Sequence, residues 1–335
     1  MSRLDELRAK AKQTPMFERT VPGRTLILDA DFLCYQAAAT VKKLATAITR
    51  FQTLVETERF ITGADSVRIH ITPRGCTKCR RYDYPTAKPY QGNRENKAKP
   101  PLLEPLRDAI QNHRWPEYFD VLAWKDREAD DGMMMDAFRL GDAAVTRSDD
   151  KDLRITPGPY WEAKLGKLDV IPDRFGWIKD DYTEGGQMKV VGHGTKFFWA
   201  QMLMGDTADN VRGIQTLEGK LCGPAGALAY LLPFKDEGQA ANAILQAYAD
   251  IQQDPLAEAQ CLWLRRSLED CAYQYLTELD LKPKLARWLK SLHNYHQEVL
   301  AFKAYKEEDD DQEYPHELSR AETTRDPGGL LLPWD

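Results

Sequence analysis

Short apolar runs alternate with segments of helical periodicity along the first half of the chain. The pattern predicts strands at 25–28, 67–72, 118–124 and 143–147. It predicts helices at 31–58, 100–114 and 129–140. The third helix should end at Gly141, a residue that commonly follows a helix C-terminus. Strands that alternate with helices indicate an α/β fold with a central, mostly parallel sheet flanked by helices.

The second half of the chain has a different character. Residues 157–195 contain Gly, Pro and short β-prone pieces, which predict a loop or hairpin. After Thr195 the pattern is helical to about residue 304. We therefore expect an α/β domain over 1–195, a helical domain over 196–304, and an acidic, loosely held tail over 305–335.

Composition limits the class of protein. Of the 335 residues, 42% are hydrophobic and 29% are charged, which is the balance of a soluble globular protein. No run of 18 apolar residues is present, and the charged N-terminus lacks the apolar stretch of a secretory signal. These features predict a cytoplasmic protein without a membrane span.

Charge is distributed unevenly. The net charge of −6 argues against a nucleic-acid binder, which is usually basic. Segment 74–107, however, holds nine Lys or Arg against three Asp or Glu, whereas 307–313 (EEDDDQE) is strongly acidic. The average hides a basic segment that is suited to a polyanion.

The chain has six cysteines, of which Cys76 and Cys79 form a CxxC pair. No second pair follows at a zinc-like spacing, and a structural zinc site needs four ligands. Ordinary reduced thiols are therefore the expectation, with a zinc or redox role as the alternative.

Acidic side chains follow the predicted strands where those strands end. In a parallel α/β sheet, functional groups lie at this edge. Carboxylates that crowd together repel one another, and the hard oxygen donors suit Mg²⁺ or Mn²⁺. Two such ions roughly 4 Å apart can hydrolyse a phosphodiester. The alternative is that each acid, Asp31 and Asp130 among them, only caps a helix. The candidate metal ligands are Asp29, Glu128, Asp130, Asp131, Asp150, Asp152, Asp206 and Asp209.

The basic segment interleaves cations with aromatic residues. Residues 78–99 contain Tyr82, Tyr84 and Tyr90 among the Lys and Arg side chains. Cations neutralise phosphates and aromatic rings stack on unpaired bases, so the segment is a candidate for carrying nucleic acid to the acids. Arg81 and Arg94 are the preferred phosphate contacts. A solvated loop with incidental charge is the alternative.

Five sequence blocks in order resemble the flap endonuclease-like 5′–3′ exonucleases, which include bacteriophage enzymes and the 5′-nuclease domain of bacterial DNA polymerase I. The blocks are LILDAD (26–31), RRYDYPTAKPYQGNR (80–94), EADD (128–131), SDDKDL (148–153) and MGDTADNVRGI (204–214). The resemblance covers about residues 26–230.

The resemblance implies a PIN-like nuclease sheet with a basic arch at about 74–99, followed by a helix–hairpin–helix element that holds duplex DNA. It implies a 5′–3′ exonuclease, with possible flap endonuclease activity, acting in phage DNA replication or recombination in the host cytoplasm. Two Mg²⁺ ions, replaceable by Mn²⁺, would be the cofactors, with K⁺ in the hairpin near Gly213–Gly223. Asp29, Glu128, Asp130 and Asp150 would hold the first ion. Asp152, Asp206 and Asp209 would hold the second, with Asp131 in either set.

Two positions depart from the family pattern. Gln91 stands where the family arch has a Lys, and Ala225 stands where the hairpin has another. For the first, either Lys88 or Lys97 replaces the Lys or phosphate activation is weaker; for the second, Lys220 is expected to compensate. The resulting catalytic candidates are Arg81, Arg94 and Lys97. The DNA-binding candidates are Arg80, Lys88, Tyr90, Gln91, Lys99, Gly213, Lys220 and Gly223.

Two other functions stay open. A PIN-like RNase would share the sheet but would not need the helical region or the GDTADN block. A non-catalytic DNA-binding accessory protein would keep the basic segment and lose acids, whereas all the matched acids are present. The acidic tail is either a solvated end or a binding segment for replication partners.

Overall fold

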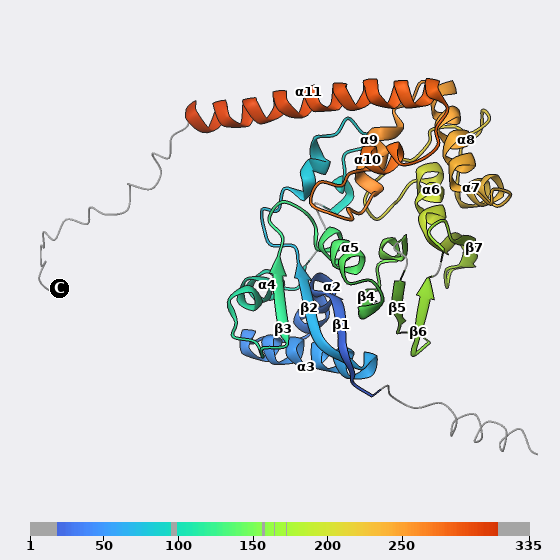
Figure 1. Ribbon diagram of the computed structural model, residues 1–335. Helices are drawn as coiled ribbons and strands as arrows, with labels where there is room; N and C mark the ends of the chain where they lie inside the picture. Colours follow the sequence, from blue (N-terminus) through green and yellow to red (C-terminus); the bar gives the residue numbers. More distant parts are fainter. Residues whose placement is uncertain (1–18, 95–98, 156–157, 164, 172, 314–335) are drawn as a thin grey trace, which may run out of the picture.

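The computed structural model describes residues 19–94, 99–155, 158–163, 165–171 and 173–313 (Figure 1). Six strands form the main sheet in the order β3-β2-β1-β4-β5-β6, and all neighbours are parallel except the β5–β6 pair. Two further strands form an antiparallel hairpin. The strands are β1 (Val21–Asp29), β2 (Ala64–Ile71), β3 (Phe119–Ala123), β4 (Ala144–Arg147), β5 (Gly158–Glu162), β6 (Lys167–Ile171), β7 (Trp177–Tyr182) and β8 (Met188–His193). The α/β architecture with a mostly parallel sheet is confirmed.

The helices lie on both faces of this sheet and beyond its β5–β6 side. They are α2 (Ala30–Ala38), α3 (Leu44–Thr62), α4 (Leu103–Asn112), α5 (Ala129–Leu140), α6 (Thr195–Met204), α7 (Pro224–Leu231), α8 (Glu237–Asp250), α9 (Pro255–Leu262), α10 (Ala272–Thr277) and α11 (Pro283–Glu313). Short 3₁₀ helices are η1 (Lys78–Asp83), η2 (Gly92–Arg94), η3 (Gly141–Ala143) and η4 (Lys151–Ile155). Figure 1 shows α11 lying across the helical part of the molecule. None of the helices formed by the described residues combines the length and apolarity of a membrane span.

The side chains of β1 alternate between the two faces of the sheet, and each face has its own layer of apolar core. Leu26 and Leu28 face the layer covered by α2, α3 and α4, whereas Ile27 faces α5. The apolar layer under α5 continues without interruption into α6–α11, where Trp199 and Tyr248 are fully buried. The boundary proposed at residue 195 therefore crosses a continuous core, and the division into domains stays a prediction.

The long helix expected over 31–58 is wrong in one respect, because two helices occupy this segment. α2 ends at Ala38 and α3 begins at Leu44, with Lys43 in extended conformation between them. The break lets both helices turn their apolar sides onto the same face of the sheet. Periodicity alone does not reveal it, since 39–43 contains neither Gly nor Pro.

The basic segment is irregular as expected, but its described part does not project as a mobile loop. Arg81, Tyr90 and Gln91 are buried, and η1 packs against α11. Aromatic and amide side chains provide enough contact to hold the segment in the absence of regular structure. Residues 95–98 lie outside the described chain.

Candidate functional site

The site begins between the parallel strands β1 and β4, where the order of the strands in the sheet reverses. Asp29 ends β1 and caps α2, accepting hydrogen bonds from the amides of Asp31 (2.9 Å) and Phe32 (3.3 Å). Ser148, just after β4, donates to the other Asp29 oxygen at 3.2 Å. Burial, together with the charges of Asp31 and Asp150, raises the pKa of Asp29 to about 7. Two adjacent parallel strands thus deliver carboxylates to one edge, which we call the acidic edge.

Asp130 faces the same edge from the first turn of α5. Burial and the nearby charges of Asp150 and Asp29 raise the pKa of its carboxyl well above the ordinary value. Within the described part of the chain, no hydrogen bond or salt bridge reaches Asp130. A carboxylate under this repulsion needs a cation or a proton.

Asp152 and Asp206 extend the acidic edge towards α6. Gln201 donates to both, at 2.7 Å to Asp152 and 2.9 Å to Asp206. The Lys151 ammonium also bridges them, at 3.0 and 2.5 Å. Burial raises the pKa of Asp152 to about 7, with the Asp150 charge adding to it. Burial also acts on Asp206, but the Lys151 charge outweighs it and lowers the pKa of that carboxyl.

Local backbone geometry explains how Asp206 and Asp209 reach the edge. Gly205 has φ of 77°, and a Cβ there would lie 2.5 Å from the carbonyl oxygens of Val211 and Arg212. The Asp206 amide donates to Val211 and the Val211 amide donates back, at 2.9 and 2.8 Å, which closes the loop that carries both acids. Only glycine adopts this conformation at such close approach without strain.

Glu128 and Asp209 are joined through the basic segment. The Gln91 amide group donates to Asp209 at 2.8 Å and to Glu128 at 3.2 Å. Tyr90 donates its hydroxyl hydrogen to Glu128 at 2.7 Å. The Lys78 ammonium lies 3.0 Å from Glu128 and 2.5 Å from the Gln91 side-chain oxygen. Tyr90 and Gln91 were expected to bind DNA; both are largely buried against the acids, and their contact with DNA stays a prediction.

Arg81 and Asp131 form a buried pair. Arg81 donates to both Asp131 oxygens at 2.7 Å, and one nitrogen also reaches Glu128 at 3.0 Å. Arg81 is 2% exposed and Asp131 is fully buried. Burial acts against the Asp131 charge, but Arg81 more than compensates and lowers the pKa of its carboxyl. The phosphate contact expected of Arg81, and the metal contact expected of Asp131, do not fit these positions.

The other basic candidates are scattered. Arg80 is engaged by Asp83 and by the Leu300 carbonyl, at 2.7 and 3.0 Å. Lys88, Lys99 and Lys220 are exposed. Arg94 has its backbone in η2, and Lys97 lies outside the described residues.

Of the two glycines expected to bind DNA in the helix–hairpin–helix element, Gly213 is buried and Gly223 is exposed. Gly213 is buried, its amide donates to Glu258 at 3.3 Å, and its carbonyl accepts from Gln253 at 2.8 Å. Gly213 is therefore poorly placed to touch DNA or a cation. Gly223 is exposed and precedes α7.

Three residues of the site escaped the sequence reasoning. Lys78 and Lys151 are each adjacent to acids that they neutralise, and Gln201 orients two carboxylates. Lys78 also stands in the left-handed region with φ of 50°, as do its two successors, and such backbone is common at functional sites. Membership of the basic segment is the only signal that could have drawn attention to Lys78.

The donor set of the acidic edge fits hard divalent ions. Every candidate ligand is a carboxylate, and Asp29, Asp130 and Asp152 carry raised pKa values that an ion would relieve. No three of these carboxylates within the described chain have oxygens within 4.8 Å of one another. A bound ion would offset the mutual repulsion of these carboxylates.

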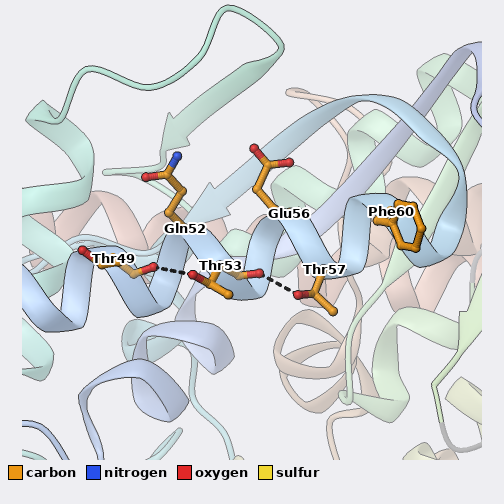
Figure 2. A pocket seen from close by; sticks show the side chains of 6 residues that line it. All are labelled: Thr49, Gln52, Thr53, Glu56, Thr57 and Phe60. Atoms are coloured by element: carbon orange, nitrogen blue, oxygen red, sulfur yellow. Dashed lines mark hydrogen bonds between the residues drawn. The ribbon is translucent and has the colours of Figure 1, made fainter.

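A shallow hollow on α3 is unrelated to this chemistry. Figure 2 shows its side chains projecting from one exposed side of the helix. Its threonine hydroxyls donate to carbonyls of the preceding turn, as Thr53 does to Thr49 at 2.9 Å. It is lined by Thr49, Gln52, Thr53, Glu56, Thr57 and Phe60.

Comparison with known proteins gives structural neighbours and no sequence relatives. No family model matches the chain, and no curated protein matches it. The chain is similar to the bacteriophage T5 D15 protein co-crystallised with metal ions, at 16% identity over 83% of this chain and 98% of that one, with a TM-score of 0.41. It is similar to T5 5′-exonuclease with bound zinc, at 15% identity over 83% and 99%, with a TM-score of 0.43.

A third neighbour is the catalytic core of Rad2 in complex with DNA substrate. It is 15% identical over 68% of this chain and 67% of that one, with a TM-score of 0.33. The T5 proteins are nucleases of the class that the sequence blocks resemble. At these identities and TM-scores, the activity has to be argued from the site itself.

Proposed function

We propose that the protein is a metal-dependent 5′–3′ exonuclease with flap endonuclease activity that hydrolyses DNA phosphodiesters, in phage replication or recombination. The observation that carries the proposal is the acidic edge. Asp29, Asp130 and Asp150 meet where β1 and β4 end, and Asp130 has no hydrogen bond or salt bridge from any described residue. A pure stability role would leave such a carboxylate paired or exposed.

Two divalent ions, Mg²⁺ or Mn²⁺, would activate a water and stabilise the leaving oxygen of the phosphodiester. Asp29, Glu128, Asp130 and Asp150 would form the first set of ligands, and Asp152, Asp206 and Asp209 the second. Asp131 leaves the ligand set in this proposal because Arg81 engages both of its oxygens. Its role is to anchor the basic segment to α5.

The chain's own cations would orient the scissile phosphate. Lys78 is held by Gln91 and Glu128 beside the acids, and Lys151 is held by Asp152 and Asp206. Ion binding would occupy these carboxylates and release both ammonium groups towards a phosphate. Lys78 is thus a better replacement for the cation absent at Gln91 than Lys88, which is exposed and lacks a contact with the acids.

The decisive experiment is digestion of 5′- and 3′-labelled duplex, flap DNA and RNA of the same sequence, with Mg²⁺ and with EDTA. We expect release from the 5′ end of DNA, dependent on the ion. Asp130→Ala and Asp206→Ala should abolish cleavage while DNA binding persists. Asp126→Ala, which changes an exposed acid near α5, should cleave at the wild-type rate.

Each alternative has its own outcome in this assay. Preferential cleavage of RNA would favour the PIN-like RNase, and the absence of cleavage with either ion would favour the accessory protein. Wild-type rates in both Asp130→Ala and Asp206→Ala would contradict the assignment of the acidic edge.

A further inference from the structure

A second group of ligand-type side chains lies on strands that carry none of the acidic-edge residues. Glu162 ends β5, Asp169 lies in β6, and His193 ends β8. Each offers one ligand atom, and these atoms all lie within 4.8 Å of one another. Among the described residues, no other group of three meets this spacing.

Strand pairing fixes the two carboxylates on one face. In the antiparallel β5–β6 pair, Tyr160 is opposite Asp169 and Glu162 is opposite Lys167. Tyr160 and Glu162 are two residues apart and project to the same side, so Asp169 lies diagonally across from Glu162. The hairpin therefore presents both acids together irrespective of loop conformation.

His193 is fixed by its backbone surroundings. The Gly194 amide donates to the Arg154 carbonyl at 2.9 Å, which ties the end of β8 to η4. A Cβ on Gly176 would lie only 2.0 Å from the His193 carbonyl oxygen, so the residue that precedes β7 packs closely against this point. The imidazole is delivered to the two acids by a separate sheet.

The polar atoms of the group are buried and incompletely satisfied. His193 is 5% exposed, and its Nδ1 has no hydrogen-bond partner in the described chain. Glu162 is 8% exposed, and its Oε1 meets the Arg154 guanidinium at 2.5 Å without hydrogen-bond geometry. Buried polar atoms are nearly always paired, so the unpaired His193 Nδ1 leaves one nitrogen of the imidazole available to a ligand.

Two cations already lie near this point: Arg154, and Lys167, whose ammonium is 3.8 Å from Asp169. The Arg154 Nη1 is 2.5 Å from Glu162 and 3.3 Å from His193 Nε2. Its side chain is 29% exposed and lies over the Tyr160 ring at 5.0 Å, so it can turn outward to solvent. Burial and the Arg154 charge lower the pKa of His193.

We propose that Glu162, Asp169 and His193 bind a transition-metal ion of the Zn²⁺ type, which ties the β5–β6 hairpin to β8 and releases Arg154 to solvent. One imidazole nitrogen and two carboxylates suit Zn²⁺, Co²⁺ or Mn²⁺, whereas Mg²⁺ prefers an all-oxygen set. Water would complete the coordination. The site is independent of the proposed nuclease activity.

Co²⁺ titration of the full chain, followed by visible absorption, tests the proposal. A nitrogen-containing site of low coordination number absorbs more strongly than an octahedral all-oxygen site, so the acidic edge contributes little to the band. We expect a saturable band in the wild type that Zn²⁺ abolishes by competition. Asp169→Asn, a conservative change at a partly exposed position, should lose the band, as should His193→Ala.

Two further variants complete the design. Asp150→Asn, which alters the acidic edge only, should keep the band. Arg154→Ala should bind Co²⁺ more tightly, on the order of tenfold, because the competing guanidinium is gone. Three outcomes would overturn the proposal and leave Arg154 as a permanent counter-charge. They are the absence of a band in the wild type, an unchanged band in folded Asp169→Asn, and weaker binding by Arg154→Ala.

Discussion

At the scale of single residues, Lys78 is the side chain that we propose in place of the cation absent at Gln91. Its neighbour in space, Gln91, is uncharged and engages Glu128 and Asp209. Burial opposes the Lys78 charge, but Glu128 more than compensates and raises the pKa of the ammonium. A permanent positive charge is thus held at the rim of the acidic edge.

Replacement of Lys78 by Ala should lower kcat/KM on 5′-labelled flap DNA by roughly 10²-fold, the usual cost of losing one group that stabilises transition-state charge. Lys88→Ala is the matched control, since it removes an exposed Lys from the same segment. Thermal melts of both variants would show whether folding is preserved. Equal rates in the two variants would refute the role of Lys78.

Arg81 presents the opposite case, a basic residue of the matched block that lies in the core. Arg81→Ala would leave Asp131 buried without its partner, so urea unfolding should show a loss of about 3–5 kcal/mol. Arg139→Ala breaks a pair whose Arg is 56% exposed and should cost less than about 1 kcal/mol. If Arg81→Ala unfolds at the wild-type midpoint yet fails to cleave DNA, the phosphate role expected from the sequence is restored.

At the scale of elements, α11 braces the basic segment from outside. Lys303 donates to the Asp83 carbonyl at 2.7 Å, and the Leu300 carbonyl accepts from Arg80 at 3.0 Å. His296, which is 1% exposed, lies 2.6 Å from Asp254 and anchors the helix to α9. A helix remote in sequence therefore positions η1, and through it Lys78.

Lys303→Ala should accordingly increase hydrogen exchange in peptides covering 78–84, because one of the contacts between η1 and α11 is lost. Lys306→Ala is the control, as its ammonium lies over the Phe302 ring, 5.0 Å away on the same helix. Exchange should rise in the first variant alone. Identical exchange in both would mean that η1 is held by its own contacts with α5 and α9.

Elements with strong local signals were predictable. The strands ending at Asp29 and Arg147, and the helix that stops before Gly141, follow from apolar runs and a C-terminal glycine. The end of α2 and the burial of Arg81 were not, because both depend on contacts between segments far apart in sequence. Arg81 reaches the carbonyls of Gln260 and Trp263, which no local pattern encodes.

The acids of the site were predictable because parallel strands end at one edge. Their unequal roles were not. Asp131 and Asp130 are adjacent, yet the first pairs with Arg81, whereas the charges of Asp150 and Asp29 act on the second. Consecutive residues of a helix point in different directions, so Asp131 reaches Arg81 while Asp130 faces the acidic edge. Which of the two becomes a candidate ligand depends on the side chains packed around each.

For the whole molecule, the acidic edge concentrates repulsion that folding must overcome. The pKa values of Asp29 and Asp152 rise to about 7, first because of burial. Their pKa is higher in the folded than in the unfolded chain, so the folded chain holds protons more strongly. The free energy of unfolding that these two carboxyls contribute is fully present below their pKa in the unfolded chain, near 4. It is lost as the pH rises through their folded-state pKa of about 7.

Without metal, the protein should therefore melt at a lower temperature at pH 8 than at pH 5.5, and Mg²⁺ should remove most of this difference. The ion neutralises carboxylates that are mostly charged at pH 8 but mostly protonated at pH 5.5, so its stabilisation must be larger at the higher pH. At about 100 times its Kd, an ion should raise the melting temperature by several degrees.

Scanning fluorimetry in EDTA and in Mg²⁺ at both pH values measures this pH dependence of the melting temperature. The double variant Asp29→Asn/Asp152→Asn should weaken the dependence, because neither amide titrates, and leave the part that Asp130 contributes. An equal Mg²⁺ shift at both pH values would mean that the ion binds elsewhere than at these carboxylates.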